Sequence, residues 1–237
     1  MNTILPELSV IIPTKNDHES IKKNINAILD YLNRSINTYE IIIVSNNSND
    51  RSVKELDSLV LELPNLKHFS FSEVGKGFAV RKGIELSIYQ NILYIDADCS
   101  VNISELNKFV QNYCLISPFV IGNRRSEFSI NLNSPILRKI TGALFNKLVN
   151  NLFKFKIEDT QCGFKAINKN IFSNCANFFS TGFCFDVELI LLARLANLSI
   201  TQVPVVYIHN FDSKLKILKD SYLMIKELIK IKQKYKI

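Results

Sequence analysis

The sequence predicts one α/β domain built on a mostly parallel sheet flanked by helices. Its 237 residues, 47% of them hydrophobic and 22% charged, have the length and composition of one globular domain with a substantial core. In the first half, short apolar runs alternate with segments whose apolar residues recur at helical spacing. Strands that alternate with helices pair in parallel, so this pattern favours a doubly wound sheet.

Several apolar runs of the first half are expected to be strands of this sheet. They span residues 8–13, 40–45, 66–71, 91–96 and 119–122. Helices are expected over 19–32, over 50–63 with Asp50 as the cap, from a glycine loop at 75 to 89, and over 104–114. Pro13, Ser45 and Asp96 all end strands, where doubly wound sheets bind their ligands. These segments therefore predict a functional edge.

The second half of the chain is less regular. Helices are expected over 134–153, 185–195 and 214–234, and strands over 160–167 and 200–208. Pro204 interrupts the last strand, which favours an edge position because proline cannot donate to the ladder. The final helix is amphipathic, with lysines opposite an apolar stripe. The stripe consists of Leu215, Leu218, Tyr222, Ile225 and Ile229, widened by Met224 and Leu228.

The formal net charge of +7 is concentrated late in the chain. The lysines of this basic end are Lys214, Lys216, Lys219, Lys226, Lys230, Lys232, Lys234 and Lys236. Such a segment suits an acidic membrane surface, a phosphorylated substrate or nucleic acid. No stacking surface of aromatic and basic residues accompanies the lysines, so nucleic acid is not expected as a partner. The apolar stripe either packs on the domain or lies on a bilayer.

No stretch approaches the roughly 18 apolar residues of a spanning helix, and the first residues lack the pattern of a signal peptide. We therefore expect a cytoplasmic protein, peripheral on the cytoplasmic face of a membrane if the basic helix lies on a bilayer. The 5 cysteines are odd in number and include no Cys-x-x-Cys pair. This spacing favours free thiols over a zinc site or a disulfide framework.

The segment Asp96-Ala97-Asp98 is the sharpest local pattern. Its two carboxylates leave a buried apolar strand with one residue between them. Inside a core they would repel each other and lose hydration, whereas a hard divalent cation would relieve that cost and could hold a diphosphate. The alternative is a pair of solvated turn aspartates before a helix capped at Ser104. The position at the carboxyl end of a strand favours the metal site.

Two further segments carry basic residues suited to phosphate. Gly75-Lys76-Gly77 opens a helix that also carries Arg81, and glycines at a helix N-terminus let the backbone approach an anion. Arg124 and Arg125 follow a strand, and arginine recognises phosphate through its planar fork. The alternative for each segment is a surface turn with solvated side chains.

Carboxylates of the second half are candidates for acid–base chemistry. Asp159 begins a polar segment that includes Gln161, and it could accept a proton or orient an acceptor. A capped turn is the alternative. Asp186 and Glu188 lie two residues apart on an apolar helix, so they cannot share one face. At least one is expected to face the site or a basic partner, and the alternative is a single structural ion pair.

In combination and in this order, these segments resemble family 2 glycosyltransferases of the Rossmann-like GT-A fold. The resemblance is closest to the polyprenyl-phosphate and dolichyl-phosphate sugar transferases, the dolichyl-phosphate β-glucosyltransferases in particular. The matching segments are 9–16, 75–81, 94–98, 122–125, 159–165, 185–189, 203–205 and 213–214. One such segment would carry little weight, whereas the whole series covers nearly the entire chain at ordinary spacing.

The resemblance implies inverting transfer of a hexose such as glucose from a nucleoside-diphosphate-sugar to a lipid phosphate, with Mg²⁺ or Mn²⁺ bound by Asp96 and Asp98. The residues implied in nucleotide-sugar binding are Pro13, Thr14, Asn16, Ser45, Asn46, Lys76, Arg81, Asp96 and Ala97. Those implied in acceptor or phosphate binding are Arg124, Arg125, Gln161 and Lys214. Asp98 and Asp159 are the implied catalytic residues, with Asp159 as a base or as a group that orients the acceptor.

The resemblance also divides the chain, and it shows one departure. A GT-A domain is expected over 1–212, with a nucleotide-binding half at about 1–100 and an acceptor half at about 101–212, before the basic helix at 213–237. The family carries an Asp pair after its second strand, where this chain has Ser45, Asn46 and Asn47. An amide both donates and accepts, whereas ionised Asp only accepts, so donor choice and activity are open.

Alternatives to this function differ in acceptor or in chemistry. The acceptor could be a saccharide hydroxyl in cell-surface polysaccharide synthesis, which would need a general base such as Asp159. A sugar-phosphate nucleotidyltransferase is a second alternative, although the N-terminus lacks a glycine-rich loop with basic residues. The departure at Asn46 motivates a third, a non-catalytic module that binds nucleotide sugars. The oligomeric state is left open.

Overall fold

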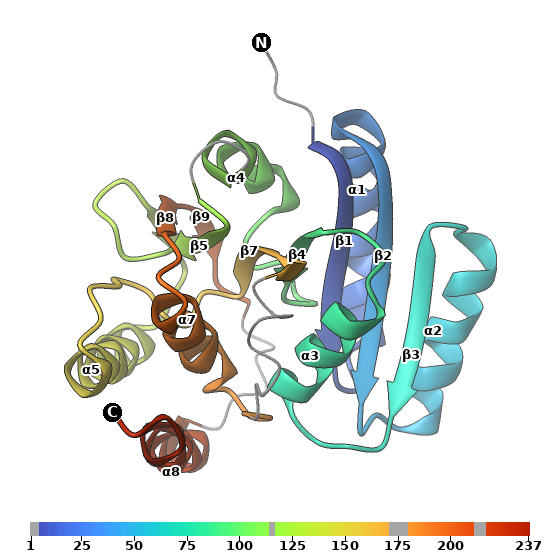
Figure 1. Cartoon of the computed structure of the whole chain (residues 1–237). Helices are drawn as coiled ribbons and strands as arrows, with labels where there is room; N and C mark the ends of the chain where they lie inside the picture. The colour runs from blue at the N-terminus through green and yellow to red at the C-terminus, as the bar shows by residue number, and fades with distance from the viewer. Residues whose placement is uncertain (1–4, 114–116, 171–179, 211–216) are drawn as a thin grey trace.

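The computed structural model describes residues 5–113, 117–170, 180–210 and 217–237. Within these ranges, a 7-stranded sheet has the order β3-β2-β1-β4-β7-β5-β8 (Figure 1). Its strands are β1 (Leu5–Thr14), β2 (Ile36–Asn46), β3 (Leu66–Phe71), β4 (Asn91–Ile95), β5 (Phe119–Asn123), β7 (Phe164–Asn168) and β8 (Ile200–Pro204). All neighbours pair in parallel except β7, which is antiparallel to β4 and β5. The predicted mostly parallel sheet is confirmed.

Helices flank this sheet on both faces. They are α1 (His18–Ser35), α2 (Asp50–Glu62), α3 (Lys76–Leu86), the short 3-10 helix η1 (Ile103–Glu105), α4 (Leu106–Tyr113), α5 (Ile136–Phe153), α7 (Phe185–Leu195) and α8 (Ile217–Tyr235). The apolar sides of α1, α2 and α4 pack in one core cluster with residues of β1 and β2. Residues of α3, α5, α7 and α8 form a second cluster on the other face. The sheet is therefore the middle layer of three.

The strands of the first half are buried on both sides, which explains their continuous apolar character. In β1, Val10 and Ile12 contribute to one core cluster and Ile11 to the other, and all three are at most 2% exposed. Successive side chains of a strand point to opposite faces of the sheet, so an uninterrupted apolar run fills both layers. The same register brings Thr14 beside Ser45 at the carboxyl ends of β1 and β2.

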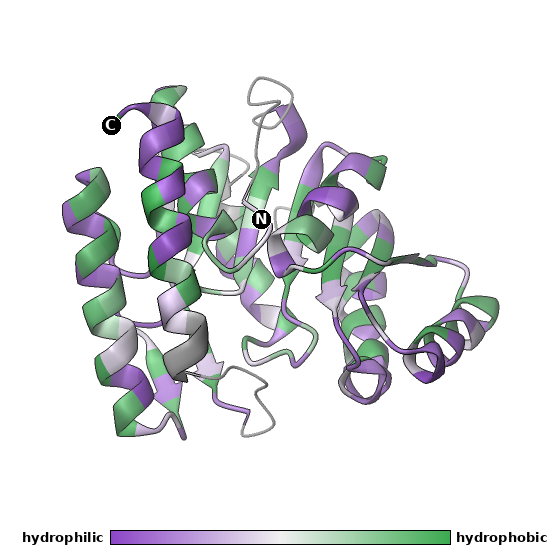
Figure 2. Ribbon diagram, turned by 90° about the horizontal axis from the view of Figure 1, so that it is seen from below, coloured by the Kyte–Doolittle hydropathy of each residue, from purple (hydrophilic) through white to green (hydrophobic). Residues whose placement is uncertain are grey.

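The final helix α8 packs on the domain through one edge of the predicted apolar stripe. Leu228 and Ile231 are fully buried in the second core cluster. By contrast, Tyr222, Ile225 and Ile229 are 58%, 43% and 50% exposed. Figure 2 shows α8 beside α5, and the two helices are in contact. Of the predicted stripe, Met224 and Leu228 thus face the core, whereas Tyr222, Ile225 and Ile229 do not. The side chains of Leu215 and Leu218 lie outside the described part of the structure.

Several element boundaries differ from the predictions. Asn49 rather than Asp50 caps α2, because the Asn49 side chain accepts a hydrogen bond from Ser52 N at 2.9 Å. The strand predicted from 160 begins at Phe164, and η1 precedes α4. The strand predicted over 200–208 divides at Pro204: β8 ends there at the edge of the main sheet, while β9 (Val206–Ile208) pairs with β6 (Ile130–Leu132). The sequence analysis did not identify β6.

Two further expectations concern the cysteines and the membrane. Cys99, Cys162 and Cys184 are free thiols, whereas Cys114 and Cys175 lie outside the described residues. Across the parts of the chain that the structure describes, no helix combines the length and apolar character needed to cross a bilayer.

Candidate active site

A cleft of about 1280 Å³ lies at the carboxyl ends of β1, β2 and β4 and continues toward α5 and α8. Its lining includes twelve of the residues implicated by the sequence, namely Pro13, Thr14, Asn16, Asn46, Lys76, Asp96, Ala97, Asp98, Arg124, Arg125, Asp159 and Gln161. The structure therefore brings together segments that lie far apart in the chain. Lys214 lies outside the described residues.

Buried polar atoms without partners mark this cleft as a binding site. Thr14 Oγ1, Ser100 Oγ, Asn131 Oδ1 and Gln161 Nε2 are buried, lack hydrogen-bond partners within the described structure, and belong to residues that line the cleft. Native proteins satisfy most buried polar atoms, so such a concentration points to groups that a ligand or solvent would satisfy. The cleft thus offers both donors and acceptors to a polar ligand.

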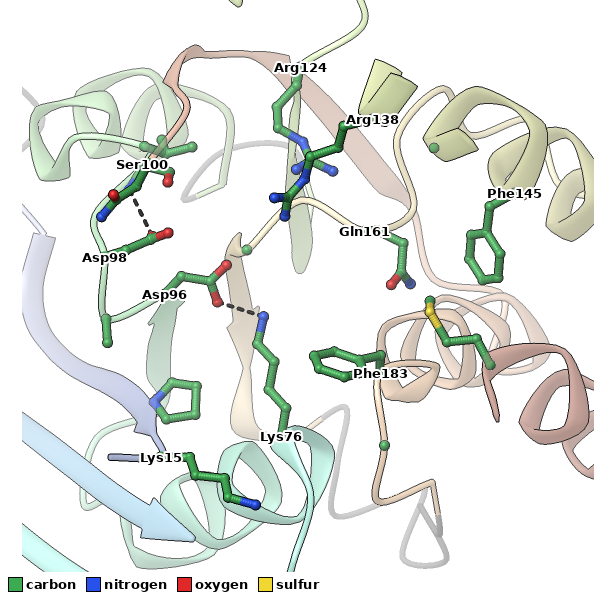
Figure 3. A pocket seen from close by; sticks show the side chains of 18 of the residues that line it. Lys15, Lys76, Asp96, Asp98, Ser100, Arg124, Arg138, Phe145, Gln161 and Phe183 are labelled. Atoms are coloured by element: carbon green, nitrogen blue, oxygen red, sulfur yellow. Dashed lines mark hydrogen bonds and ion pairs between the residues drawn. The ribbon is translucent and has the colours of Figure 1, made fainter. Parts of the chain in front are cut away.

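Asp96 contacts both the start of α3 and the residue before β7. Its Oδ1 lies 2.6 Å from Lys76 Nζ at the start of α3 (Figure 3). Its backbone N–H donates to Gly163 O at 3.1 Å, just before β7. A Cβ at position 163 would lie 2.0 Å from Asp96 Oδ2, so only glycine leaves room for this carboxylate. Gly163 therefore fixes where Asp96 can present its oxygens.

Asp98 is a partly buried carboxylate beside a second carboxylate, an arrangement that a bound cation would stabilise. Its Oδ1 accepts a hydrogen bond from Ser100 N at 3.0 Å (Figure 3). Burial and the repulsion of Asp96 raise the pKa of Asp98, although the hydrogen bond from Ser100 N opposes the shift. No cluster of three or more acidic, histidine or cysteine ligands occurs among the described residues. Mg²⁺ is commonly held by one or two carboxylates plus substrate phosphates, so a site that uses Asp96 and Asp98 would not form such a cluster.

Lys76 is held at a helix N-terminus with an unusual backbone. Gly75 precedes it with φ of 135°, and a Cβ there would lie 2.0 Å from Thr181 O. Burial alone would lower the pKa of Lys76, but the attraction of Asp96 and other nearby carboxylates outweighs it and leaves the pKa raised. Lys76 is therefore a permanent cation beside Asp96, at a helix end that itself favours anions.

The departure at Asn46 has a structural explanation. When its amide is oriented to satisfy both neighbours, Asn46 donates to Thr14 O at 2.8 Å and accepts from Gly75 N at 3.0 Å. The side chain thus ties β1 to the loop before α3. A carboxylate could accept from Gly75 N but could not donate to Thr14 O. Asn at this position therefore supports the local backbone, in addition to lining the cleft.

Ser45 and Arg81 do not line the cleft. Ser45 is fully buried, and its Oγ lies 2.7 Å from His68 Nε2, whose Nδ1 in turn lies 2.7 Å from Asp57 Oδ1. Alternation along β2 places Ser45 on the opposite face from Asn46, where it meets His68 of β3 instead of the cleft. Arg81 lies one turn into α3, where it is 3.8 Å from Glu85 Oε1 and stacks over the Phe78 ring.

Asp159 is engaged by arginine at the other end of the cleft. Its two oxygens accept from Arg124 Nε at 2.6 Å and Arg124 Nη2 at 2.9 Å, and Arg125 Nε lies 3.9 Å away. Burial alone would raise the pKa of Asp159, but the attraction of these arginines outweighs it and leaves the pKa lowered. A carboxylate with both oxygens engaged and a lowered pKa is a poor proton acceptor. The geometry favours a positioning role.

The structure adds cleft residues that the sequence analysis did not select. Arg138 and Phe145 come from α5, and Leu223 and Met224 come from α8 (Figure 3 labels the first two). These residues reach the cleft because α5 and α8 pack against it, and no local sequence motif indicates that packing. Helical spacing predicted only that they lie on helices.

The two acidic residues of α7 have separate partners. Asp186 Oδ1 lies 2.7 Å from Lys165 Nζ and accepts from Tyr94 Oη at 2.7 Å, behind Asp96. Glu188 is fully buried and accepts from Ser180 N at 2.7 Å. Lys234 Nζ also lies 3.6 Å from Glu188 Oε1, so each of the two carboxylates has a basic partner of its own.

Known proteins share the sequence pattern and the fold of this chain. The model of glycosyl transferase family 2 matches residues 9–175. A dolichyl-phosphate beta-glucosyltransferase of Trichomonas vaginalis is 30% identical over 223 residues, which cover 87% of this chain and 65% of the relative. The enzyme of the same name from Dictyostelium discoideum is 29% identical over 246 residues, which cover 96% and 74%. This chain thus spans 65% of the first relative and 74% of the second.

Solved structures show the same fold at lower identity. Mannosyl-3-phosphoglycerate synthase from Rubrobacter xylanophilus has a TM-score of 0.71 at 18% identity, covering 97% of this chain and 74% of that one. Mannosyltransferase PcManGT from Pyrobaculum calidifontis, in complex with GDP-Man and Mn²⁺, has a TM-score of 0.67 at 16% identity, covering 99% and 65%. The neighbours are GT-A glycosyltransferases, so the GT-A fold is confirmed. With the family match over most of the chain, these findings establish it as a member of glycosyl transferase family 2.

Proposed function

We propose that this glycosyltransferase moves a hexose from a nucleoside-diphosphate-sugar to the phosphate of a polyprenyl-type lipid, with inversion at the anomeric carbon. The observation that carries the proposal is a cleft with an acidic pair and a lysine at one end and arginines and apolar helices at the other. The nucleotide-binding half is assigned to about residues 1–100 and the acceptor half to about 101–212. The similarity to dolichyl-phosphate beta-glucosyltransferases supports the choice of acceptor.

The donor end is assigned to the edge formed by β1, β2 and β4. Asp96 and Asp98 would hold Mg²⁺ or Mn²⁺, which would neutralise charge on the diphosphate. Lys76 adds a fixed positive charge at the start of α3, where the helix dipole also favours phosphate. Thr14 Oγ1 lacks a partner within the described structure and lines the same end. The complex of a structural neighbour with Mn²⁺ and GDP-Man supports such a donor.

The acceptor phosphate is assigned to the arginines of the cleft. Arg124, Arg125 and Arg138 line it together, and arginine binds phosphate in a bidentate manner. Asp159 orients Arg124 through two hydrogen bonds. A phosphate monoester is already ionised near neutral pH, so its oxygen can attack without a general base. A phosphate acceptor is therefore compatible with Asp159, whose two carboxylate oxygens both accept hydrogen bonds from Arg124.

The transfer itself is a direct displacement. An oxygen of the lipid phosphate attacks the anomeric carbon from the face opposite the diphosphate, and the new oxygen–carbon bond forms as the bond to the donor's diphosphate breaks. The electron pair leaves with the diphosphate, where Lys76 stabilises the developing negative charge. The role of this chain is to align two anions that would otherwise repel each other, and to do so between positive side chains.

Apolar surface continues from the cleft onto α5 and α8. Phe145, Leu223 and Met224 line the cleft, and on the outer side of α5 the side chains of Ile136, Leu137, Ile140 and Leu144 are between 53% and 75% exposed. Exposed patches of this kind mark interaction sites. Lys139 and Lys147 on α5 and Lys226 and Lys230 on α8 are also exposed. We assign this α5–α8 surface to peripheral contact with the cytoplasmic face of an anionic bilayer, where the lipid acceptor resides.

The donor assignment is tested by thermal unfolding in the presence of UDP, GDP, CDP, dTDP and their common sugars, each with and without Mn²⁺. A ligand that binds only the folded state raises its apparent stability. We expect a shift that depends on Mn²⁺ with one nucleotide and disappears in Asp98→Ala. If none of the nucleotides changes the unfolding temperature of the wild-type protein, the donor assignment is wrong.

The alternative of a saccharide hydroxyl acceptor is disfavoured by the same geometry. A hydroxyl must lose its proton in the reaction, and Asp159 has both oxygens occupied by Arg124. If the acceptor were a saccharide, Asp159→Asn would nearly abolish turnover and remove an acidic limb from the pH profile. With a phosphate acceptor, we expect turnover to fall through a higher acceptor KM, without loss of that limb.

A further inference from the structure

The loop Ser180–Cys184 lies between the donor end of the cleft and α8. On one side, Glu227 of α8 accepts hydrogen bonds from Ser180 Oγ, from Gly182 N at 2.9 Å and from Cys184 N at 3.1 Å. Its Oε1 serves Ser180 and Gly182, and its Oε2 serves Cys184. A single carboxylate of the last helix therefore holds three donors of this loop.

On its other side, the loop holds the start of α3. Thr181 O accepts from Phe78 N and Gly182 O accepts from Gly77 N, both at 3.2 Å. Lys76, which reaches Asp96, lies immediately before these two amides. The first N–H groups of a helix have no partner within the helix, so the loop supplies acceptors that α3 itself cannot. The position of the Lys76 backbone thus depends on the loop.

Glycines allow close approach on both sides of the loop. A Cβ on Gly182 would lie 2.5 Å from Glu227 Oε2, and one on Gly77 would lie 2.5 Å from Ser180 O. A Cβ on Gly75 would lie 2.0 Å from Thr181 O. Contacts this tight leave little slack, so a shift of α8 relative to the domain would be transmitted to α3.

A second carboxylate anchors the same junction. Glu188 of α7 accepts from Ser180 N at 2.7 Å and from Tyr235 Oη of α8 at 2.6 Å. Cys184 Sγ additionally donates to Met224 O at 3.2 Å. The loop therefore contacts α8 at several points, while Glu227 is the α8 carboxylate that reaches its backbone amides directly.

We propose that Glu227 is a positioning residue for donor binding, which couples the placement of α8 to Lys76 through the loop Ser180–Cys184 and the start of α3. The inference rests on the proposed function, since Lys76 matters only if a nucleotide diphosphate binds beside it. Glu227 is assigned no proton transfer, because both of its oxygens already accept hydrogen bonds. A displacement of α8, which forms part of the α5–α8 surface, would thereby also displace Lys76 at the donor end.

The coupling is tested first by hydrogen exchange in the whole chain without ligand. In Glu227→Gln the side-chain NH₂ faces backbone donors, so at least one hydrogen bond of the loop is lost. We expect faster amide exchange in peptides covering 180–184 and also in peptides covering 76–79. The control is Gln233→Glu, the reverse exchange at an exposed position of the same helix, which should leave both peptides unchanged. Faster exchange confined to 180–184 would refute the coupling.

Donor binding is the second readout. The probe is whichever nucleoside diphosphate, with Mn²⁺, binds the wild-type protein by calorimetry. Loss of one charged hydrogen bond is expected to weaken its binding about tenfold in Glu227→Gln, with the acceptor KM unchanged. Equal binding by wild type and variant would overturn the inference, whereas no binding by the wild type would overturn the proposed function. If Glu227→Gln fails to fold, Gly182→Ala disturbs the same contact from the loop side.

Discussion

Lys76 Nζ lies 2.6 Å from Asp96 Oδ1, and this ion pair joins the glycine-rich helix start to the acidic segment after β4. The sequence predicts the first segment as a phosphate site and the second as a metal site, with no sign that they are in contact. Their contact places a fixed cation and a candidate metal ligand at one point of the cleft. In the proposed reaction, both act on the diphosphate that leaves.

The apo protein should tolerate, or gain from, loss of the charge at Asp98. Because burial and Asp96 raise the pKa of Asp98 in the folded state, its ionisation near neutral pH lowers folding stability. We therefore expect Asp98→Asn to unfold at the wild-type temperature or up to about 3 °C higher, as roughly 1 kcal/mol would produce in a chain of this size. Differential scanning calorimetry measures this. Stabilisation by Mn²⁺ with nucleotide should be lost in the same variant, and a clearly lower apo unfolding temperature would contradict the assignment.

Displacement of Asp96 without its removal tests the role of Gly163. In Gly163→Ala the new Cβ would lie 2.0 Å from Asp96 Oδ2, so the carboxylate must move. We expect Mn²⁺ affinity in the presence of nucleotide to fall at least about tenfold, which corresponds to 1.4 kcal/mol, measured by calorimetry. Gly142→Ala is a matched control, because its Cβ would approach only the movable end of Arg125, at 2.8 Å from Nη2. Unchanged Mn²⁺ affinity in Gly163→Ala would show that Asp96 does not bind the metal.

The ion pair between Asp159 and Arg124 should contribute to the free energy of unfolding, and this contribution should be lost in acid. The pKa of Asp159 is lowered below its unfolded value of about 3.9, so the pair stabilises the fold above roughly pH 4. That contribution fades as the pH falls from about 4 through the lower folded pKa. Removal of one partner of a buried pair costs about 3–5 kcal/mol, so Asp159→Asn should be less stable by that amount at pH 7 and approach the wild type below pH 4. Urea denaturation across this range measures the difference.

The matched control for Asp159 is Glu127→Gln, which removes an exposed carboxyl near the same arginines in sequence. It should differ from the wild type by less than about 0.5 kcal/mol at every pH. A stability difference for Asp159→Asn that stays constant from pH 7 to pH 3 would mean that the pair does not set the pKa of Asp159.

Asn46→Asp introduces an acidic residue of the kind that the family resemblance implies after the second strand, and we expect it to weaken the fold. The amide donates to Thr14 O, and a carboxylate would face that carbonyl without a proton to donate. The loss should be about 1–3 kcal/mol, measured by chemical denaturation at pH 7. Asn46→Ala, which removes both bonds, distinguishes lost hydrogen bonding from carboxylate–carbonyl repulsion. A variant Asn46→Asp as stable as the wild type would show that Asn46 does not tie β1 to Gly75.

The sequence predicted the donor edge well because its signals are local. Asp96 and Asp98 follow a buried strand, and parallel strands bring their carboxyl ends to one edge whatever the rest of the chain does. In the sheet, β1 lies between β2 and β4, so the three carboxyl ends are adjacent. The side of β2 on which Ser45 lies depended on strand register, and its bond to His68 of β3 could not be inferred from either segment alone.

The acceptor end was harder to predict because it is built by tertiary packing. Arg138 and Phe145 reach the cleft only because α5 packs over it. The packing side of α8 was only partly predicted, because hydropathy placed Leu228 and Ile229 in one stripe and only Leu228 is buried. The pairing that lowers the pKa of Asp159 also required two loops to meet, so the sequence left its role as a base open.

The most direct test of the proposed function is mass spectrometry of the lipid product. Purified protein is incubated with dolichyl phosphate, Mn²⁺ and the nucleoside-diphosphate-hexose selected by thermal unfolding. The molecular mass of the extracted lipid is then measured. The account predicts dolichyl phosphate heavier by one hexose, formed by the wild type and absent with Asp98→Ala or a chelator. Lipid of unchanged mass, under conditions in which the wild type binds the donor, would contradict it.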